Sequence, residues 1–262
     1  MQIVVCIKQV IDPEMPYSAF KIDPEEKRVI PPQGTPPVLS PFDENALEAA
    51  LRIKDKYRAN VIALSMGNKL ARPVLRKALA AGADELIMLE APELKDLDSF
   101  ASACVLAAAI RRIGKVDIIF TGRQAADWDS GITGCALAEE LDIPCVTVAR
   151  KVDVNGQMAR VERVLSDGYE VIESPIPCVI TVDSDLGELR PVTLQGLSGA
   201  QQKPVQSWGL PELDLLSPPA PSCQLLDMYM PKRETVCEII DGTTVEDAAT
   251  NLVDKLKEKS LI

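Results

Sequence analysis

The sequence predicts an α/β protein with a mainly parallel, Rossmann-like sheet and helices on both faces. Short apolar runs alternate with segments of helical periodicity, which is the pattern of repeated strand–helix–strand units. The runs Ile3–Ile7 and Asp117–Thr121 are almost continuously apolar, as expected for strands that are covered on both faces. With 262 residues, 47% of them hydrophobic, the chain can form one large domain with appendages.

A long irregular excursion is expected after the first strand, Ile3–Ile7. Residues 11–41 are rich in proline and have no clear periodicity, apart from a short hairpin predicted around residues 21–30. Asp43 is then expected to cap a helix whose apolar positions continue to Tyr57.

The next predicted elements are a strand, a helix, a strand and a helix. The strand Asn60–Met66 precedes a helix with Pro73 in its first turn and Gly82 after its end. The strand Leu86–Leu89 follows, and then Ser99–Ile113, which is apolar almost all round and is therefore expected to be a buried helix.

A polar loop follows the strand Asp117–Thr121 and leads into a helix that Ser130–Gly134 opens. This helix is expected to run to about Leu141, with a strand at Cys145–Ala149. The first N–H groups of a helix have no partner within it and attract anions such as phosphate. In an open α/β sheet, ligands bind beyond the carboxyl ends of the strands. The alternative is an ordinary turn in which Ser130 is the helix N-cap.

The second half of the chain does not continue the alternation of strands and helices. Turns at Asn155-Gly156 and Asp167-Gly168 predict a small antiparallel meander, and Pro177–Val182 reads as another buried strand. From Leu189 to about Pro231 the chain is punctuated by proline and is expected to form an extended arm. Such an arm cannot bury enough of itself to offset its ordering entropy, so it needs another surface.

The last predicted element is a helix with a capping box. Thr244 and Asp247 stand at the capping-box positions, and an apolar stripe follows. This helix is expected to pack either on the core of the chain itself or on a partner. The predicted organisation is residues 1–188 as the α/β domain, 189–232 as the arm and 233–262 as the C-terminal segment.

Composition excludes several classes of function. The net charge of −11 argues against nucleic acid as a partner, and no run of about 18 apolar residues predicts a membrane span. Since the N-terminus enters a strand directly, no signal peptide is expected, and the cytoplasm or an organelle matrix is the expected location. The sequence has no histidine, which removes Ser-His-Asp and Cys-His catalysis, and we expect no catalytic residue. The seven cysteines form no CxxC pair, which indicates reduced, buried thiols and no metal site.

A series of motifs in order identifies a family resemblance. The loop GRQAADWDSGITG with the following LAEELDIP resembles the signature region of the electron transfer flavoprotein β subunit. The likeness covers nearly the whole chain and includes MQIVVCIKQVIDP, KIDP, SPFDENALEAALRIKD, LRKALAAGADE, PCVITVDSDLGELRPVTLQGL and VEDAATNLVDKLKEK. It implies an adenine nucleotide α-hydrolase-like variant of the fold.

The resemblance also implies cofactors and partners. Proteins of this family are αβ heterodimers in which FAD is bound mostly by the α subunit. The β subunit holds AMP or, in the electron-bifurcating branch, a second FAD. The partner is expected to be a flavin dehydrogenase of the acyl-CoA dehydrogenase kind, with NADH and ferredoxin as further candidates in the bifurcating branch. The loop matches neither branch fully, so AMP and FAD both stay open.

Carried over by motif, four segments would form the nucleotide site. The backbone N–H groups of Gly131, Ile132 and Thr133 would bind the phosphate, and Asp127 and Asp129 are assigned to loop structure or to ribose and backbone bonds. Trp128 is expected either to stack on an adenine or flavin ring or to cover the loop. The implied site residues are Cys6, Ser40, Pro41, Phe42, Asp43, Met66, Gly67, Gly122, Arg123, Gln124, Ala125, Asp127, Asp129, Ser130, Gly131, Ile132 and Thr133.

A partner-docking loop is implied by the segment RPVTLQGL, residues 190–197. Leu194 takes the position of the anchoring leucine and is followed by Gln195, Gly196 and Leu197. The lysine-rich continuation of some relatives is reduced here to Lys203.

The same α/β pattern also permits a function of another class. A stand-alone nucleotide-binding module, either stress-protein-like or an adenylating pyrophosphatase, would share the fold. The missing GxGxxG and SGGxDS signals and the long arm argue against this alternative.

Overall fold

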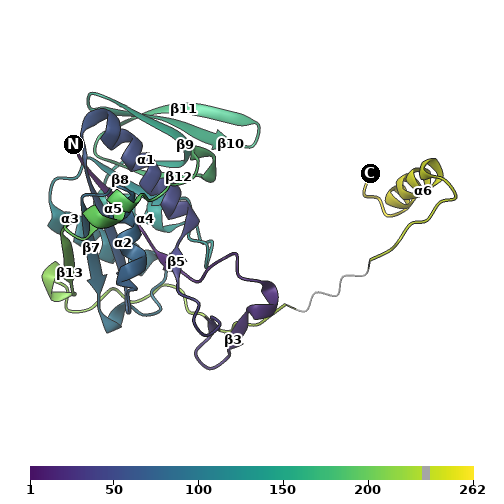
Figure 1. Ribbon diagram of the computed structural model, residues 1–262, viewed down its shortest axis with the longest axis horizontal. Coiled ribbons are helices and arrows are strands. Elements are labelled where there is room, and N and C mark those ends of the chain that lie inside the picture. Colours follow the sequence, from purple (N-terminus) through teal and green to yellow (C-terminus); the bar gives the residue numbers. More distant parts are fainter. Residues whose placement is uncertain (232–236) are drawn as a thin grey trace.

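The structure, a computed structural model, describes residues 1–231 and 237–262. Within these residues the main sheet has nine strands, in the spatial order β11-β10-β9-β12-β8-β1-β6-β7-β13 (Figure 1). Their bounds are β1 Gln2–Cys6, β6 Asn60–Gly67, β7 Glu85–Glu90, β8 Ile118–Gly122, β9 Cys145–Asn155, β10 Met158–Leu165, β11 Gly168–Pro175, β12 Cys178–Val182 and β13 Val205–Trp208.

The main sheet is parallel except at one end. β12, β8, β1, β6, β7 and β13 are parallel to their neighbours, and β9 is parallel to β12. β10 and β11 add an antiparallel meander to β9, and its two-residue turns, at residues 156–157 and 166–167, are each displaced by one residue from the predicted Asn-Gly and Asp-Gly pairs. The predicted mainly parallel sheet with a small meander is therefore confirmed.

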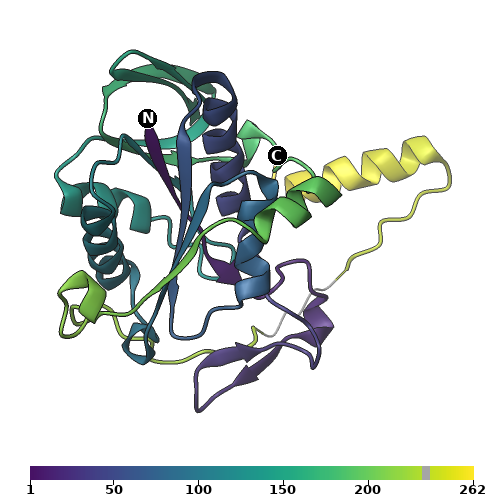
Figure 2. The ribbon, with the colours of Figure 1, turned by 60° about the vertical axis from the view of Figure 1, so that its left-hand side comes forward.

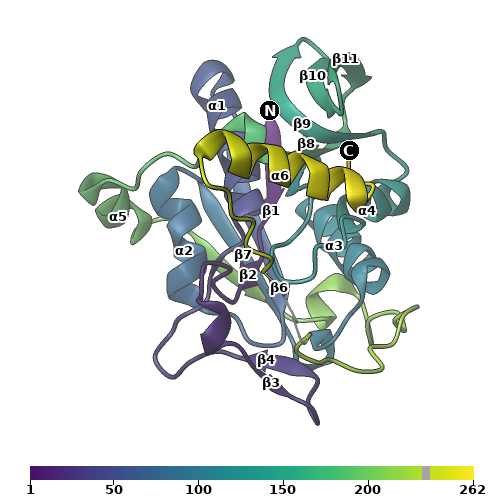
Figure 3. The same ribbon diagram turned by 90° about the vertical axis from the view of Figure 1, so that its right-hand side faces the viewer.

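Helices cover both faces of the sheet, as Figure 3 shows. One buried cluster lies between the sheet and α1 and α2, and the other lies between the sheet and α3 and α4. Alternate residues of β1 divide between them: Ile3 and Val5 belong to the first cluster and Val4 to the second. The helices are α1 Pro41–Tyr57, α2 Arg72–Ala81, α3 Ser99–Ile113, α4 Thr133–Leu141, α5 Leu194–Ala200 and α6 Val245–Glu258.

The proline-rich excursion contains two small antiparallel pairs. The predicted hairpin is present as β3 (Lys21–Asp23) and β4 (Arg28–Ile30). β2 (Gln9–Val10) pairs with β5 (Val38–Leu39), which returns the chain to the start of α1. Short 3-10 turns lie at Tyr17–Ala19, Pro92–Leu94, Ser184–Leu186 and Pro211–Leu213.

The predicted cap at Asp43 is wrong, and so is the alternative of a cap at Ser130. Ser40 occupies the N-cap position of α1, so Asp43 lies inside the first turn, where its side chain bonds to neighbouring strands instead of to its own helix. Ile132 occupies the N-cap position of α4, without a side-chain bond, so Ser130 is not the cap. In both cases a tertiary contact of the polar side chain replaces the local bond that the sequence suggested.

The prediction of an extended arm from Leu189 is wrong over residues 194–208. α5 packs on α2, and β13 then joins the edge of the sheet in parallel with β7. Lys203 fastens the connection, because its ammonium donates hydrogen bonds to the carbonyls of Leu79 and Ala83 at the end of α2. Both elements are too short to show periodicity, and pairing with distant segments stabilises them.

Between β13 and α6 the described residues form the 3-10 turn Pro211–Leu213 and no other helix or strand. The predicted capping box is present: Thr244 Oγ1 accepts the Asp247 N–H at 3.1 Å, and Asp247 Oδ2 accepts the Thr244 N–H at 3.2 Å. None of the residues of α6 is buried, and Figure 1 shows the helix apart from the sheet. The predicted boundary at residues 232 and 233 lies outside the described residues, and the division of the chain into three parts stays a prediction.

The cysteines differ in part from expectation. All seven are free thiols, but only Cys6 and Cys178 are buried, while Cys135, Cys223 and Cys237 are exposed. Among the described residues, no group of His, Cys, Asp or Glu side chains is arranged to hold a metal ion. In the same part of the chain, no helix is long and apolar enough to cross a bilayer.

Candidate functional site

Three adjacent strands bring predicted site residues to one edge of the sheet. β8, β1 and β6 are neighbours, and they end at Gly122, Cys6 and Gly67. β6 extends past the end of β1, since Cys6 lies opposite Leu64, and this places Met66 and Gly67 at the rim. The expected gathering of these residues at the carboxyl ends of the strands therefore follows from the parallel register.

The start of α1 is tied to this edge by buried polar groups. Asp43 Oδ2 accepts the backbone N–H of Lys8 at 2.8 Å, and Asp43 Oδ1 accepts the backbone N–H of Gly122 at 3.0 Å. The Ser40 N–H donates to the Lys8 carbonyl at 2.8 Å, and Ser40 Oγ accepts the Ala126 N–H at 3.4 Å. Ser40–Asp43 thus lies beside β1 and the loop after β8, as the motif implied.

Burial controls the titration of two of these side chains. It raises the pKa of Asp43 to about 7, although the N–H bonds from Lys8 and Gly122 and the Lys8 ammonium act in the opposite direction. It also raises the pKa of the Cys6 thiol to about 12, with a further contribution from the Asp43 charge. Cys6 is therefore a protonated, apolar wall of the site at neutral pH.

The two carboxylates in the loop between β8 and α4 hold its shape. Asp127 forms an ion pair with the Lys8 ammonium at 2.7 Å and accepts the Trp128 N–H. Asp129 adopts a left-handed conformation with φ of 50°, and its carboxylate accepts a bond from the Gln124 amide at 2.8 Å. The assignment of both residues to loop structure agrees with these bonds.

The start of α4 presents three free backbone donors. Among the described residues, the N–H groups of Gly131, Ile132 and Thr133 donate no hydrogen bond to the protein. Gly131 has φ of 65°, a conformation that suits glycine, and it is exposed. A Cβ on Gly134 would lie only 2.6 Å from Thr181 Cγ2, so this glycine allows α4 to pack closely on β12. The loop can thus accept a phosphate on unsatisfied donors at a helix N-terminus.

Arg123 adds a further unsatisfied donor beside the loop. Its guanidinium stacks on the Phe42 ring, 4.8 Å from the centroid, and one Nη donates to Asp183 at 2.9 Å. Its Nε is buried and has no hydrogen-bond partner within the described residues. Buried donors are rarely left unpaired, so this atom is consistent with a ligand oxygen at the site.

Apolar side chains of the loop face solvent. Trp128 is 57% exposed and Ile132 is 56% exposed. Trp128 therefore covers little of the protein itself, which disfavours the interpretation of its indole as a lid on the loop and leaves it available to a ring.

Several contacts of the site were not predicted from the sequence. Ser99, at the start of α3, is hydrogen-bonded through its hydroxyl to Ser130 at 2.9 Å, and Asp183 holds Arg123 from the end of β12. Lys8, which follows β1, forms an ion pair with Asp127. For Lys8, its position after a predicted strand is the one feature of the sequence that could have pointed to the site. For Ser99 and Asp183 the sequence has no such feature.

The predicted docking residues form the first turn of α5. Leu194 is 85% exposed and Leu197 is 51% exposed, and the Thr193 hydroxyl caps the helix by accepting the Gly196 N–H. A Cβ on Gly196 would collide with the carbonyl of Ala80 at the C-terminal end of α2. Since the helices that follow parallel strands end near the amino ends of the strands, these leucines lie toward the end of the sheet opposite the loop between β8 and α4. Figure 2 shows α5 beside α2.

A salt-bridge cluster fixes the segment that leads into α5. The Arg190 guanidinium pairs with Glu48 at 2.9 Å and with Asp55 at 2.9 Å, and Glu48 is buried. Lys203, the single lysine left of the lysine-rich continuation, bonds to α2 and is only partly exposed.

Comparison with known proteins assigns the family. A family model described as "Electron transfer flavoprotein domain" matches residues 28–213. "Caffeyl-CoA reductase-Etf complex subunit CarD" of Acetobacterium woodii is 38% identical over the full length of both chains. The chain belongs to the electron transfer flavoprotein β-subunit family. "Electron transfer flavoprotein subunit beta" of Clostridium acetobutylicum is 36% identical, again over the full length of both chains.

A further full-length relative has a name that refers to a reductase of a CoA ester. "Acryloyl-CoA reductase electron transfer subunit gamma" of Anaerotignum propionicum is 33% identical, with complete coverage of both chains. The family match at residues 28–213 spans the loop between β8 and α4 and the first turn of α5. The resemblance inferred from the motifs is therefore confirmed at the level of the family.

Proposed function

We propose that this β subunit binds an adenine nucleotide, either AMP or a second FAD, and works in a heterodimer with an α subunit that holds the redox FAD. In that complex it helps to pass electrons between a dehydrogenase and the flavin. The observation that supports nucleotide binding best is at the start of α4, where the N–H groups of Gly131, Ile132 and Thr133 have no hydrogen-bond acceptor in the described part of the chain.

The residues at the strand ends have complementary roles in this proposal. The three N–H groups bind phosphate oxygens, and the buried Nε of Arg123 supplies one more donor. Cys6 and Met66 form apolar walls, and Trp128 offers an exposed ring for stacking on adenine or flavin. A second FAD would add electron-accepting chemistry to the site, whereas AMP would not.

The proposed partners follow from exposed apolar surfaces and from the names of relatives. The Leu194 side chain is 85% exposed and is suited to a hydrophobic pocket on a dehydrogenase. Because two full-length relatives carry the names of CoA-ester reductases, we propose that this dehydrogenase acts on a CoA ester. NADH and ferredoxin are the proposed donor and acceptor for a heterodimer that contains two flavins.

The alternative function is a stand-alone nucleotide-binding module. The exposed apolar residues Val245, Leu252 and Val253 of α6 favour a subunit, because a self-sufficient module has no use for an uncovered apolar stripe. The chain expressed alone and the chain co-expressed with an α subunit distinguish the two. A subunit is expected to be poorly soluble when it is expressed alone and to give a yellow complex when it is co-expressed with the α subunit. A stand-alone module is expected to be a soluble, colourless monomer in both cases.

The decisive experiment counts nucleotides in the purified heterodimer. The complex is denatured, and the released FAD and AMP are quantified by chromatography. One FAD with one AMP indicates a simple carrier, and two FAD indicate a second flavin in this subunit. One FAD with no other nucleotide contradicts nucleotide binding by this chain.

A matched pair of glycine variants tests the phosphate-binding loop. Gly131 and Gly156 have similar φ values, 65° and 62°, but Gly156 lies in the hairpin turn between β9 and β10. Gly131→Val is expected to deplete the second nucleotide, while Gly156→Val imposes the same backbone strain and leaves the nucleotide in place. Equal nucleotide content in the two variants rules out the proposed phosphate site.

A further inference from the structure

Asp43 is a buried carboxylate whose two oxygens are both used by the protein. Only 6% of the residue is exposed, and its oxygens accept the backbone N–H groups of Lys8 and Gly122. Lys8 follows β1, and Gly122 ends β8, so one side chain from α1 connects the ends of two adjacent strands. A carboxylate with both oxygens engaged in this way has little capacity left for a ligand.

The loop between β8 and α4 depends on the same junction at three points. Gly122 begins the loop, and its N–H is bonded to Asp43. Asp127, in the middle of the loop, pairs with the ammonium of Lys8, whose own N–H is the other donor to Asp43. The Ala126 N–H donates to Ser40, which precedes α1.

Close packing makes the contact between Asp43 and Gly122 specific. A Cβ on Gly122 would lie 2.7 Å from Asp43 Oδ1 and 2.7 Å from the Cβ of Phe42. Any side chain at position 122 would therefore displace Asp43 or Phe42. An asparagine in place of Asp43 would accept one of the two N–H groups and oppose the other with its own amide N–H.

We propose that Asp43 is a positioning residue of the nucleotide site, which holds the ends of β1 and β8 and the loop after β8 in the binding conformation without touching the nucleotide. This inference rests on the proposed function, since it needs a nucleotide at the strand ends. It changes the role of Asp43 from the ligand contact that the motif implied to a contact within the protein that shapes the loop.

The charged and titratable groups around Asp43 are consistent with this role. The Lys8 ammonium and the Asp127 carboxylate lie nearby with opposite charge, and the Cys6 thiol stays protonated. Above its raised pKa of about 7 Asp43 is ionised, and hydrogen bonds to an ionised acceptor are stronger than neutral ones, so in this form the carboxylate is suited to fixing two backbone groups.

The test compares three variants of the full chain in complex with its α subunit. Asp43→Asn keeps one acceptor and the volume of the side chain, and Asp43→Ala removes both acceptors. Glu44→Gln is the matched control, because Glu44 lies in the same helical turn but forms an ion pair with Lys77 at the surface. AMP and FAD are the probes, added to complex from which the second nucleotide has been removed. Each Kd is calculated from the concentration of folded complex in the preparation.

We expect Asp43→Asn to raise the Kd of the bound nucleotide about tenfold and Asp43→Ala to raise it further, while Glu44→Gln leaves it unchanged. Amide hydrogen exchange at Lys8 and Gly122 is expected to accelerate in the two Asp43 variants, with exchange in β7 and β12 unchanged. If Asp43→Ala does not fold, Asp43→Asn alone carries the comparison with the wild type.

Two outcomes overturn the inference and are distinguishable. If the wild-type complex binds AMP or FAD and a folded Asp43 variant with accelerated exchange binds it equally well, the positioning role is wrong and the proposed function stands. If the wild-type complex binds neither probe, the proposed function fails and the positioning role fails with it.

Discussion

The nucleotide loop, residues 122–133, and the helix α6 are both expected to bind another molecule, but the protein holds them differently. The loop is held by long-range contacts from Asp43, Lys8 and Ser99, which come from three other parts of the chain. α6 is held by local contacts, namely its capping box and ion pairs from Lys255 and Lys259 to Glu238. None of its residues is buried.

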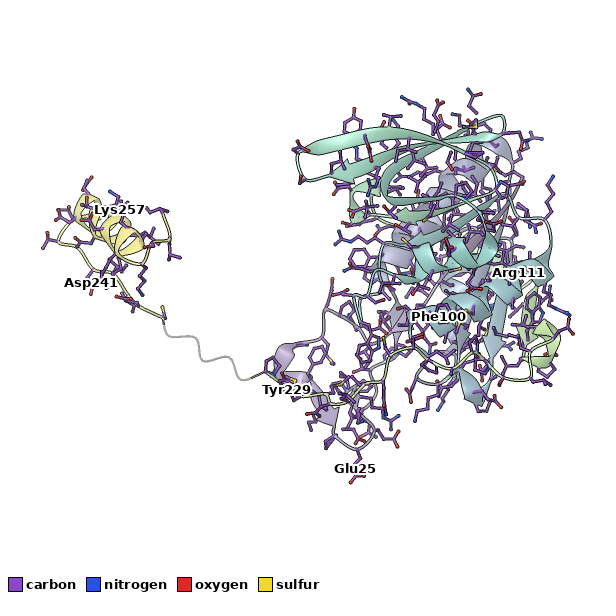
Figure 4. All side chains as sticks on the ribbon, turned by 180° about the vertical axis from the view of Figure 1, so that it is seen from behind. Glu25, Phe100, Arg111, Tyr229, Asp241 and Lys257 are labelled. Carbon is purple, nitrogen blue, oxygen red and sulfur yellow. The ribbon has the colours of Figure 1, made fainter. Side chains whose placement is uncertain are left out.

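The comparison shows that the loop is held in one conformation by the rest of the chain, whereas α6 is a formed helix with no surface of the described chain to pack on. The loop already has its conformation because buried polar groups in the core specify it. α6 has a defined start and an apolar stripe, but the burial that normally stabilises such a helix in a protein is missing from the chain by itself. Figure 4 shows Lys257 of α6 far from Phe100 and Arg111 of α3, with Tyr229 near the point where the chain leaves the body.

The segment before α6 belongs partly to the body. The N–H groups of Ser222 and Cys223 donate to Asp98 at 2.6 and 2.9 Å, and the Lys27 ammonium donates to the carbonyl of Leu225 at 3.0 Å. Beyond that point Leu226 is strongly exposed. These contacts hold the segment to the body as far as Leu225.

The largest expected effect concerns the pH dependence of stability in the body. Asp43 has its pKa raised from 3.8 to about 7 in the folded chain, so the folded state holds a proton that the unfolded chain loses. Its contribution to stability is greatest below pH 4 and falls as the pH rises through 7, by an amount on the order of several kcal/mol. The stability of the wild type relative to Asp43→Asn should therefore decrease between pH 5 and pH 8 in urea unfolding. A difference that is constant or increases with pH contradicts the assigned burial.

The next prediction compares a closely packed glycine at the start of α4 with an unpacked glycine in α5. Gly134→Ala brings a methyl group against Thr181 and Thr121, and it is expected to cost about 1–3 kcal/mol of unfolding free energy. Gly199→Ala, in α5, meets no atom within 4 Å and is expected to be neutral or slightly stabilising. Chemical denaturation of both variants measures the contrast, and equal effects would show that α4 can shift without cost.

A smaller effect is expected for the cap of α6. Thr244→Ala removes the side-chain acceptor of the Asp247 N–H and is expected to cost the helix about 1 kcal/mol. Because α6 buries nothing, helical chemical shifts of residues 245–258 should weaken while the unfolding midpoint of the sheet stays the same. A lower midpoint would mean that α6 packs on the body.

The smallest effect on stability is expected at Leu194. Its side chain is 85% exposed, so Leu194→Ala should change the unfolding free energy by less than about 0.5 kcal/mol. Electron transfer to or from the partner dehydrogenase should nevertheless slow, with the flavin content unchanged. Loss of flavin from this variant would indicate a structural role for the turn and not a docking role.

Elements with a strong local pattern could be predicted from the sequence. β1 and β8 were recognisable because both of their faces are buried and their apolar runs are continuous. α3 has the predicted bounds Ser99–Ile113, since an apolar run of this length with arginines at its end has few other conformations. The hairpin between β9 and β10 was recognisable from the Asn-Gly pair, although its turn lies one residue further along, at residues 156–157.

Elements stabilised by distant partners could not be predicted. α5 and β13 have few residues and weak patterns, and they exist because α2 and the edge of β7 pair with them. The same reason explains the errors at Asp43 and Ser130, whose polar side chains bond to Lys8 and Gly122 and to Ser99 instead of to their own helix.

The sequence by itself determined the alternation of strands and helices, the family, and the position of the glycine-rich turn before α4. These depend on periodicity and on turn chemistry, which act over a few residues. The tertiary structure decided which oxygen meets which N–H at the strand ends, where β13 joins the sheet, and that α6 lies uncovered. Such contacts join residues far apart along the chain, and their energies depend on burial that exists only once the sheet has formed.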